Sequence, residues 1–226
     1  MADAETAQQS IAPLARKVGE GSFARITRLQ PAKLRTVKAV LFVLALLPLA
    51  RLVTLGVLDD LGANPVEFVI RSNGTWTLTF LLITLAITPL KKITGMGWLL
   101  GLRRMLGLFA FFYAVLHFLS YVWLDQWFDW HAIVKDVAKH RYVLVGFAAF
   151  LCLIPLAATS TNAMMRRLGK RWQALHRLVY VIGVLGVVHY WWLVKKDITL
   201  PLVYGAVLAL LLGYRLFSRP QRSRTA

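Results

Sequence analysis

The stretch 176–189 reads HRLVYVIGVLGVVH, an apolar run with a histidine at each end. An imidazole inside a lipid bilayer is costly unless it bonds to another group, so an intramembrane histidine is a functional candidate. A helix rises about 1.5 Å per residue, which would place His176 and His189 roughly 20 Å apart, one toward each membrane face. Histidines from neighbouring helices at two such levels could hold haem within a bundle. A polar helix end at His176 and a hydrogen-bonded core residue at His189 would explain the stretch equally well.

The composition indicates that this stretch belongs to a polytopic membrane protein. Of the 226 residues, 58% are hydrophobic, and the mean hydropathy is +0.60, whereas soluble domains are nearer half apolar and lack long uncharged apolar runs. The net charge of +17 does not indicate a nucleic-acid partner, because the Lys and Arg residues lie between the apolar runs rather than in one patch. The single cysteine, Cys152, excludes an internal disulfide and a cysteine-rich metal site.

Six apolar segments, each near the roughly 20 residues that cross a bilayer, predict an all-α, six-transmembrane-helix bundle. The segments are 38–57, 76–90, 105–124, 142–158, 178–194 and 198–217. They make one transmembrane domain, 38–217, between a flexible N-terminal arm, 1–37, and a tail, 218–226. The arm lacks the apolar core of a secretory signal, so the first apolar run is expected to remain in the protein as an anchor. No internal repeat is visible in the sequence.

The positions of the cations predict the orientation of the bundle in the membrane. Most of the 27 Lys and Arg residues lie in the arm, in the loops 91–104 and 159–177, and in the tail, which all fall on one side. Cytoplasmic loops carry the excess of Lys and Arg, so both termini are expected in the cytoplasm. The short turn 195–197 makes the last two helices antiparallel neighbours.

His117 lies within LFAFFYAVLHFLSYVWL, in the outer half of a helix that runs in the same direction as the helix of His189. The two histidines are therefore expected at similar depth on different helices, which is the arrangement for axial ligation of one b-type haem by two neutral imidazoles. The alternative is two core histidines that are satisfied by separate partners. His131 and His140 lie outside or at the edge of the apolar runs, so we expect them to be solvated and not to ligate a metal.

The inner level around His176 is less well defined, because no second intramembrane histidine stands opposite it. The residues at the equivalent distance before His117 are Arg103 and Arg104. An inner haem held by His176 and a weaker second ligand is one interpretation, and a flavin or quinone ring held by His176 and the arginine pair is another. The arginines could also serve only as anchors on the positive side of the membrane. Since this level faces the cytoplasm, we predict that electrons enter here.

Two further features leave alternatives open. The thirteen-residue spacing from His176 to His189 turns an ideal helix about 140° away from its starting face. Either the helix is tightened near Gly183 or Gly186, or His176 lies in a frayed first turn.

Apart from Lys38 and Arg215 at span ends, which count with the arm and the tail, Arg51 is the one charged residue inside a predicted span. It could pair with a haem propionate or another anionic group, or its long side chain could reach a membrane face.

The sequence carries no nucleotide-binding domain, because no GxGxxG follows a strand and no P-loop or CxxC occurs. If the protein moves electrons, it must receive them from another molecule and pass them on. Two functions of other classes compete with this reading: a transporter whose histidines relay protons, and a cofactor-free membrane anchor. The transporter would need more acidic or polar residues inside the spans than this sequence has.

Several stretches of the chain resemble the MsrQ family, also called YedZ. They lie in order over roughly residues 36–217 and read LGANPVEFV, ITPLKK, LRRMLGLFAFFYAVLHFLSY, TSTNAMMRRLGKRWQALHRLVYVIGVLGVVHYWWLVK and PLVYG. The resemblance implies a haem-binding membrane subunit of the bacterial system that reduces methionine sulfoxide in periplasmic proteins. It also implies a wider kinship with ferric reductases and NADPH oxidase membrane domains.

The same resemblance implies cofactors, partners and site residues. Members of this family are expected to pass electrons across the inner membrane to MsrP, a periplasmic molybdopterin enzyme that repairs oxidised methionines. The chain would then be an electron-transfer subunit rather than the catalytic one. The resemblance implies b haem, with one or two haems as alternatives, and FMN as a second cofactor. As the electron donor we expect a cytoplasmic flavin reductase or the quinone pool. The family's haem histidines match His117, His176 and His189, and its arginine pair matches Arg103 and Arg104.

Overall fold

The computed structural model describes residues 30–194 and 196–217, which are helical apart from short turns and contain no strand. Within them, the helices long and apolar enough to cross a membrane number six: Pro31–Val57, Pro65–Thr94, Gly97–Asp125, Arg141–Ala158, Lys170–Leu193 and Thr199–Phe217. This confirms the expected all-α bundle with six membrane-spanning helices.

The spans are divided into named elements as follows. The first, second, fourth and sixth spans are α2, α3, α6 and α10. The third consists of a 3-10 turn, η1 (Gly97–Leu99), the helix α4 (Leu100–Ser120) and a π-helical turn, η2 (Tyr121–Asp125). The fifth consists of α8 (Lys170–Leu175) and α9 (Leu178–Leu193). Two short helices lie between spans, α5 (Trp130–Lys139) and α7 (Asn162–Leu168).

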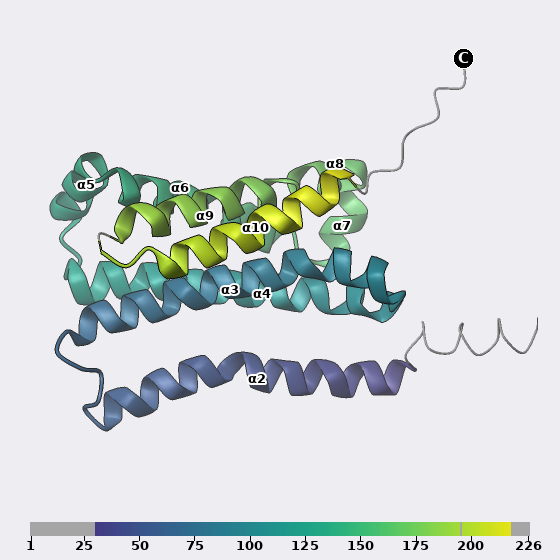
Figure 1. The fold of residues 1–226 in the computed structure, drawn as a ribbon, viewed down its shortest axis with the longest axis horizontal. Coiled ribbons are helices and arrows are strands. Elements are labelled where there is room, and N and C mark those ends of the chain that lie inside the picture. The colour runs from purple at the N-terminus through teal and green to yellow at the C-terminus, as the bar shows by residue number, and fades with distance from the viewer. Residues whose placement is uncertain (1–29, 195, 218–226) are drawn as a thin grey trace, which may run out of the picture.

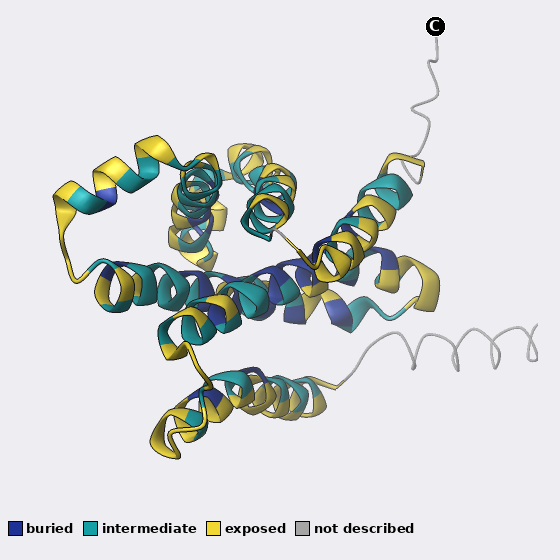
Figure 2. Ribbon diagram, turned by 60° about the vertical axis from the view of Figure 1, so that its left-hand side comes forward, coloured by how far each residue is buried: buried dark blue, intermediate teal, exposed yellow. Residues whose placement is uncertain are grey.

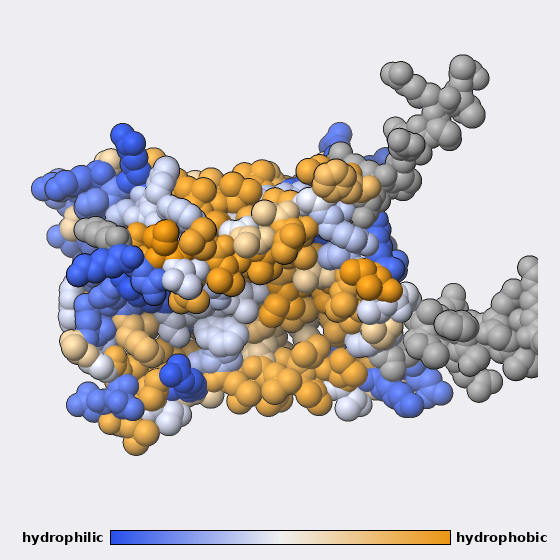
Figure 3. Space-filling view, viewed as in Figure 1, coloured by the Kyte–Doolittle hydropathy of each residue, from blue (hydrophilic) through white to orange (hydrophobic). Residues whose placement is uncertain are grey.

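The long helices lie side by side, with α2 on one flank next to α3 and α4, and with α6, α9 and α10 on the other (Figure 1). Helix α2 begins and α10 ends at the same end of the bundle, and α5 lies at the opposite end. The outward faces of α2 and α10 are largely exposed and apolar (Figure 2). The side of the molecule is therefore an apolar band between two hydrophilic ends (Figure 3), as a bilayer requires.

Helix α3 begins at Pro65, well before the expected start at residue 76. Asn64 caps it by accepting the backbone N–H of Glu67 at 3.2 Å, and proline at the first helical position suits a helix start. The polar stretch that follows is helical because its side chains have tertiary partners. Asn73 is 3% exposed and donates to the Ser120 hydroxyl at 3.4 Å. Packing against α4 thus overrides the polar sequence signal of a loop.

The link between α3 and α4 is shorter than the expected loop 91–104. Gly95 ends α3 with a φ of 72°, a left-handed conformation that glycine adopts without strain. Helix α4 begins at Leu100, so Arg103 and Arg104 lie in its first turns rather than in a loop. Helix α2 likewise includes 31–37, which the sequence analysis assigned to the arm; the rest of the arm, 1–29, and the tail, 218–226, lie outside the described residues.

The core is centred on α3 and α4. Tyr113 is fully buried, and its ring stacks on Phe80 with the centroids 5.4 Å apart. Its hydroxyl donates to the carbonyl of Ala45 at 2.7 Å. Because a tyrosine hydroxyl in an apolar interior needs a partner, this bond ties α2 to the rest of the bundle.

A second tie between helices depends on Pro89 inside α3. Proline has no N–H, so the carbonyl of Leu85, one turn earlier, loses its helical donor. Arg215 of α10 donates to that carbonyl at 3.0 Å and also donates to the hydroxyl of Tyr180 on α9. One arginine therefore joins α10 to both α3 and α9.

The last two spans pack as antiparallel neighbours across a short link, as predicted. Asp197 in this link accepts the backbone N–H of Thr199, the first residue of α10, at 2.9 Å. Hydrogen bonds from the hydroxyl and the N–H of Thr199 lower the pKa of the Asp197 carboxyl. The ionised carboxylate also interacts favourably with the positive end of the α10 dipole.

Candidate functional site

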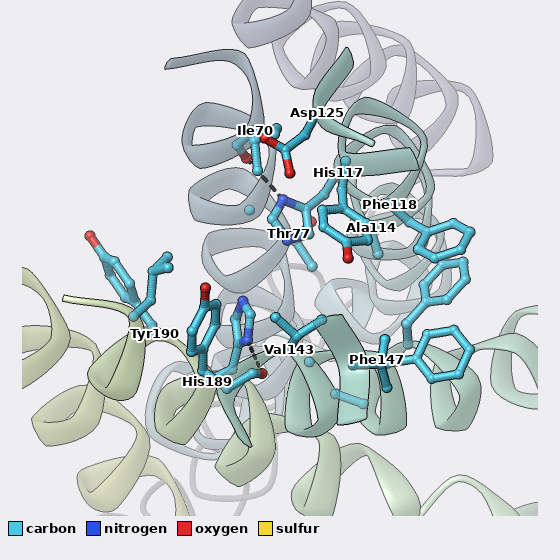
Figure 4. A pocket seen from close by; sticks show the side chains of 18 of the residues that line it. Ile70, Thr77, Ala114, His117, Phe118, Asp125, Val143, Phe147, His189 and Tyr190 are labelled. Atoms are coloured by element: carbon cyan, nitrogen blue, oxygen red, sulfur yellow. Dashed lines mark hydrogen bonds between the residues drawn. The ribbon is translucent and has the colours of Figure 1, made fainter. Parts of the chain in front are cut away.

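A cavity of about 950 Å³ lies between the α3–α4 hairpin and the α6–α9 pair, toward the end of the bundle where α5 lies. Its walls are mainly aliphatic and aromatic, with Leu78 and Leu81 from α3, Phe118 from α4 and Phe147 from α6. The volume is at the upper end of the range for cofactor and ligand sites, roughly 300–1,000 Å³. The two histidines expected at similar depth, His117 and His189, both line it (Figure 4).

Each of these histidines is held by a backbone carbonyl of a neighbouring helix. Nδ1 of His117 lies 2.9 Å from the carbonyl oxygen of Ile70, and Nδ1 of His189 lies 2.7 Å from that of Tyr142. A carbonyl oxygen can only accept, so Nδ1 carries the proton in both rings. In a neutral imidazole the other nitrogen, Nε2, then has a free lone pair, which is the form that ligates metals.

The two rings face one another across the cavity. Figure 4 shows the bonded Nδ1 atoms directed outward to the helices and the Nε2 atoms directed toward each other. The ring centroids are 6.1 Å apart, and the ring planes are 80° apart. A metal ion bound by two imidazole nitrogens at about 2 Å each would separate the centroids by roughly 6 Å. The separation therefore fits one metal ion between the two rings.

The surroundings of the two histidines repeat each other. In each case 47 residues separate the histidine from the carbonyl it bonds. In each case a glycine stands one helical turn after that carbonyl and lies against the imidazole, Gly74 beside His117 and Gly146 beside His189. The α3–α4 hairpin and the α6–α9 pair thus present the same local unit from two sides. The sequence shows no repeat because the two units have little more in common than a glycine and a histidine.

His176, which was expected at the inner level, lies in the turn between α8 and α9 and not within a helix. Its Nδ1 bonds to the carbonyl oxygen of Trp172 at 3.1 Å, and its ring stacks on the Trp172 ring with the centroids 3.9 Å apart. Its Nε2 is buried without a hydrogen-bond partner among the described residues. The helix break explains the thirteen-residue spacing and favours the frayed first turn over a tightened helix.

Arg103 and Arg104 lie at the same end of the bundle as His176 and do not line the cavity. Arg104 is exposed and donates to the side-chain oxygen of Asn162 on α7, whereas Arg103 is half-buried. Arg104 precedes His117 by the same number of residues as His176 precedes His189. The α6–α9 unit therefore has a histidine, His176, at the position where the α3–α4 unit has an arginine, Arg104.

The other candidates do not line the cavity. Arg51 is exposed on α2 and is not among the lining residues. His131 is exposed on α5. His140, between α5 and α6, bonds through Nδ1 to the Asp136 carboxylate at 2.6 Å and does not line the cavity.

Comparison with known proteins identifies the family. Residues 73–187 match the family of the ferric reductase like transmembrane component. A protein of Ralstonia nicotianae named "Protein-methionine-sulfoxide reductase heme-binding subunit MsrQ" is 57% identical over 192 residues, 84% of this chain and 88% of the relative. The chain belongs to the MsrQ family. The MsrQ of Herminiimonas arsenicoxydans is 55% identical over 190 residues (83% and 87%), and that of Bordetella pertussis is 58% identical over 181 residues (79% and 88%). No solved structure is significantly similar to the chain.

Three groups at the cavity of this MsrQ chain were not foreseen from its sequence. Asp136 of α5 lines the cavity and accepts a hydrogen bond from the hydroxyl of Tyr121 at 2.7 Å. No local pattern indicates this contact, because it forms only when α5 folds back over the end of α4. Gly74 and Gly146 are the other two. A glycine within a helix is a weak signal of close approach, but it does not say what approaches.

Proposed function

We propose that this chain is a haem-binding, electron-transfer subunit of a protein-methionine-sulfoxide reductase in the bacterial inner membrane. The printed name of its relatives and its ferric-reductase-like family support this role. The excess of Lys and Arg near the end where α2 begins and α10 ends supports an orientation with both termini in the cytoplasm. The outer cavity then lies in the half of the membrane that faces the periplasm.

The outer cavity is the proposed site of one b-type haem, whose iron would be held by Nε2 of His117 and Nε2 of His189. The observation that carries this assignment is that the two Nε2 atoms face one another while each Nδ1 donates to a carbonyl. Such a hydrogen bond fixes the orientation of a ligand imidazole and raises its basicity. Bound haem would supply reversible one-electron chemistry, while the apolar walls of the cavity exclude water.

The inner level around His176, Arg103 and Arg104 is the proposed entry point for electrons. The buried, unbonded Nε2 of His176 supports a ligand there, either a second haem or a flavin or quinone ring. Arginine can bind a propionate or a flavin phosphate through paired hydrogen bonds. Because this level lies at the cation-rich end, we propose a cytoplasmic flavin reductase with FMN, or the quinone pool, as the donor. The proposed acceptor is a periplasmic MsrP-like molybdopterin reductase at the α5 end.

The competing functions fit the cavity less well. In a proton relay, each imidazole would pass a proton to another titratable group. Here the Nδ1 atoms of His117 and His189 are bonded to backbone carbonyls, which do not carry protons onward. A cofactor-free anchor gives no reason for two Nε2 atoms to be directed at each other across a mainly apolar cavity, because a polar group at membrane depth is costly unless it binds a partner.

An absorption spectrum of the purified protein tests the proposed function. We expect an intense Soret band that shifts on reduction with dithionite and returns on oxidation. The protein should be purified from cells supplied with a haem precursor, so that cofactor supply does not limit occupancy. A folded, monodisperse protein without this band would contradict the proposal and favour the anchor or the transporter.

A further inference from the structure

We propose that Gly74 and Gly146 are positioning residues for the two imidazoles of the outer cavity. Each glycine leaves the space in which a histidine ring lies against the helix and reaches the carbonyl one turn earlier. This inference rests on the proposed function, since it concerns how the ligands of a haem are oriented.

The space at these two positions is taken up by imidazole atoms. A Cβ added at Gly146 would lie 2.6 Å from Nδ1 and 2.8 Å from Cε1 of His189. A Cβ added at Gly74 would lie 3.0 Å from Cε1 and 3.1 Å from Nδ1 of His117. Both separations are tighter than ordinary carbon contacts, so the ring would have to move in either case. The crowding is greater at Gly146.

Neither imidazole ring can move away from an added Cβ without disturbing the contact of Nδ1 or the direction of Nε2. Nδ1 is fixed by its hydrogen bond to the carbonyl, and Nε2 is directed at the opposite ring. A movement away from an added methyl group would lengthen the first contact or misdirect the second. Losing the hydrogen bond on a ligand imidazole weakens metal binding by about 10- to 100-fold.

The ordinary explanation for a glycine in a membrane helix is that it lets two helices approach closely. The contacts recorded at other glycines of the bundle fit that explanation. Gly186 would meet a side-chain carbon of Leu78 at 3.4 Å, and Gly107 would meet one of Thr84 at 3.7 Å. At Gly74 and Gly146 the nearest atoms belong instead to the proposed ligands. Glycine in a helix interior is destabilising relative to alanine, so its presence beside both rings needs a compensating role.

The test compares Gly146→Ala and Gly74→Ala with two matched controls. Gly107→Ala lies on α4, the helix of His117, and would make only an ordinary contact. Gly213→Ala lies on α10, where nothing stands within 4 Å of the added atom. The measurements on purified protein are haem content, the low-spin EPR signal of the ferric haem, the midpoint potential and thermal unfolding. The EPR signal is informative because it depends on the angle between the two ligand planes.

We expect Gly146→Ala to lose haem or to show a shifted low-spin signal, Gly74→Ala to show a smaller change of the same kind, and both controls to resemble the wild type. A wild-type EPR signal, potential and haem content in Gly146→Ala would overturn the proposal. If Gly146→Ala does not accumulate as folded protein, the milder Gly74→Ala decides by the same criteria. Failure of the proposed function would look different, because the wild-type protein itself would then lack haem.

Discussion

At the scale of the residue, the histidines differ in what holds Nδ1. His117 and His189 bond to carbonyls of neighbouring helices, which fixes each ring relative to the bundle. His176 bonds to the carbonyl of its own preceding turn, and His140 bonds to the carboxylate of Asp136. A hydrogen bond from Nδ1 to a carbonyl fixes the tautomer and the orientation of a ligand imidazole. This contrast favours His117 and His189 as the structurally defined pair.

The sequence predicted the shared depth of His117 and His189, because depth follows from position along a helix of known direction. It could not predict that the carbonyls of Ile70 and Tyr142 would accept Nδ1, since these contacts join residues 47 positions apart. Nor could it show that Arg51 is exposed on α2, away from the cavity. Apolar periodicity gives depth but does not say which faces of different helices meet.

Replacing Arg103 and Arg104 together by lysine separates a cofactor role from an anchoring role. Lysine keeps the charge but cannot form the same paired hydrogen bonds. If the arginines bind a cofactor, reduction of the haem by a flavin donor should slow at least tenfold, consistent with the loss of about 1.4 kcal/mol from a charged hydrogen bond. The rate is measured by stopped-flow absorption, and the outer haem spectrum should persist.

The matched control for this pair is Arg166→Lys with Arg167→Lys on α7. It makes the same charge-preserving change at the same end of the bundle. Wild-type reduction rates in both double variants would mean that the arginines only anchor the helix, and the entry point would have to be sought elsewhere.

At the scale of the element, helix boundaries were predicted wrongly from the sequence where polar residues lie inside helices. The expected start of the second span at residue 76 missed the first turns of α3, because the polar stretch after Glu67 looks like a loop. Its residues are helical since Asn73 and Gly74 pack against α4. The break at His176 was foreseen only as one of two alternatives. Six apolar segments, in contrast, were sufficient to predict the six spans.

Arg215 provides a test of how α10 is held in the bundle. Arg215→Ala would leave the carbonyl of Leu85, which Pro89 deprives of its helical donor, without a partner. An unsatisfied buried carbonyl costs about 1–3 kcal/mol. We therefore expect a lower midpoint of thermal unfolding in detergent, followed by tryptophan fluorescence, with the outer haem spectrum intact in the folded protein. Lys135→Ala, an exposed cation of α5, is the control. Equal midpoints for the two variants would show that this tie contributes nothing.

At the scale of the whole molecule, two similar hairpin units enclose one cavity, but the inner level is not symmetric. In the unit of α6 and α9, His176 lies thirteen residues before the cavity histidine His189, whereas in the unit of α3 and α4 it is Arg104 that lies thirteen residues before His117. The outer site thus offers two imidazoles, and the inner site offers one imidazole and a cationic face. This difference fits the proposed direction of electron transfer, from an entry at the cation-rich end to the apolar cavity roughly 20 Å away.

The low-spin haem spectrum of His189→Ala tests the central claim most directly. Absorption and EPR spectra are recorded with haem content for His189→Ala and His117→Ala, with His131→Ala and His140→Ala as controls that do not line the cavity. We predict that either cavity variant loses the outer haem or its low-spin signal, while both controls keep the wild-type spectrum. An unchanged spectrum and haem content in His189→Ala, or loss of haem from folded His140→Ala protein, would contradict the account.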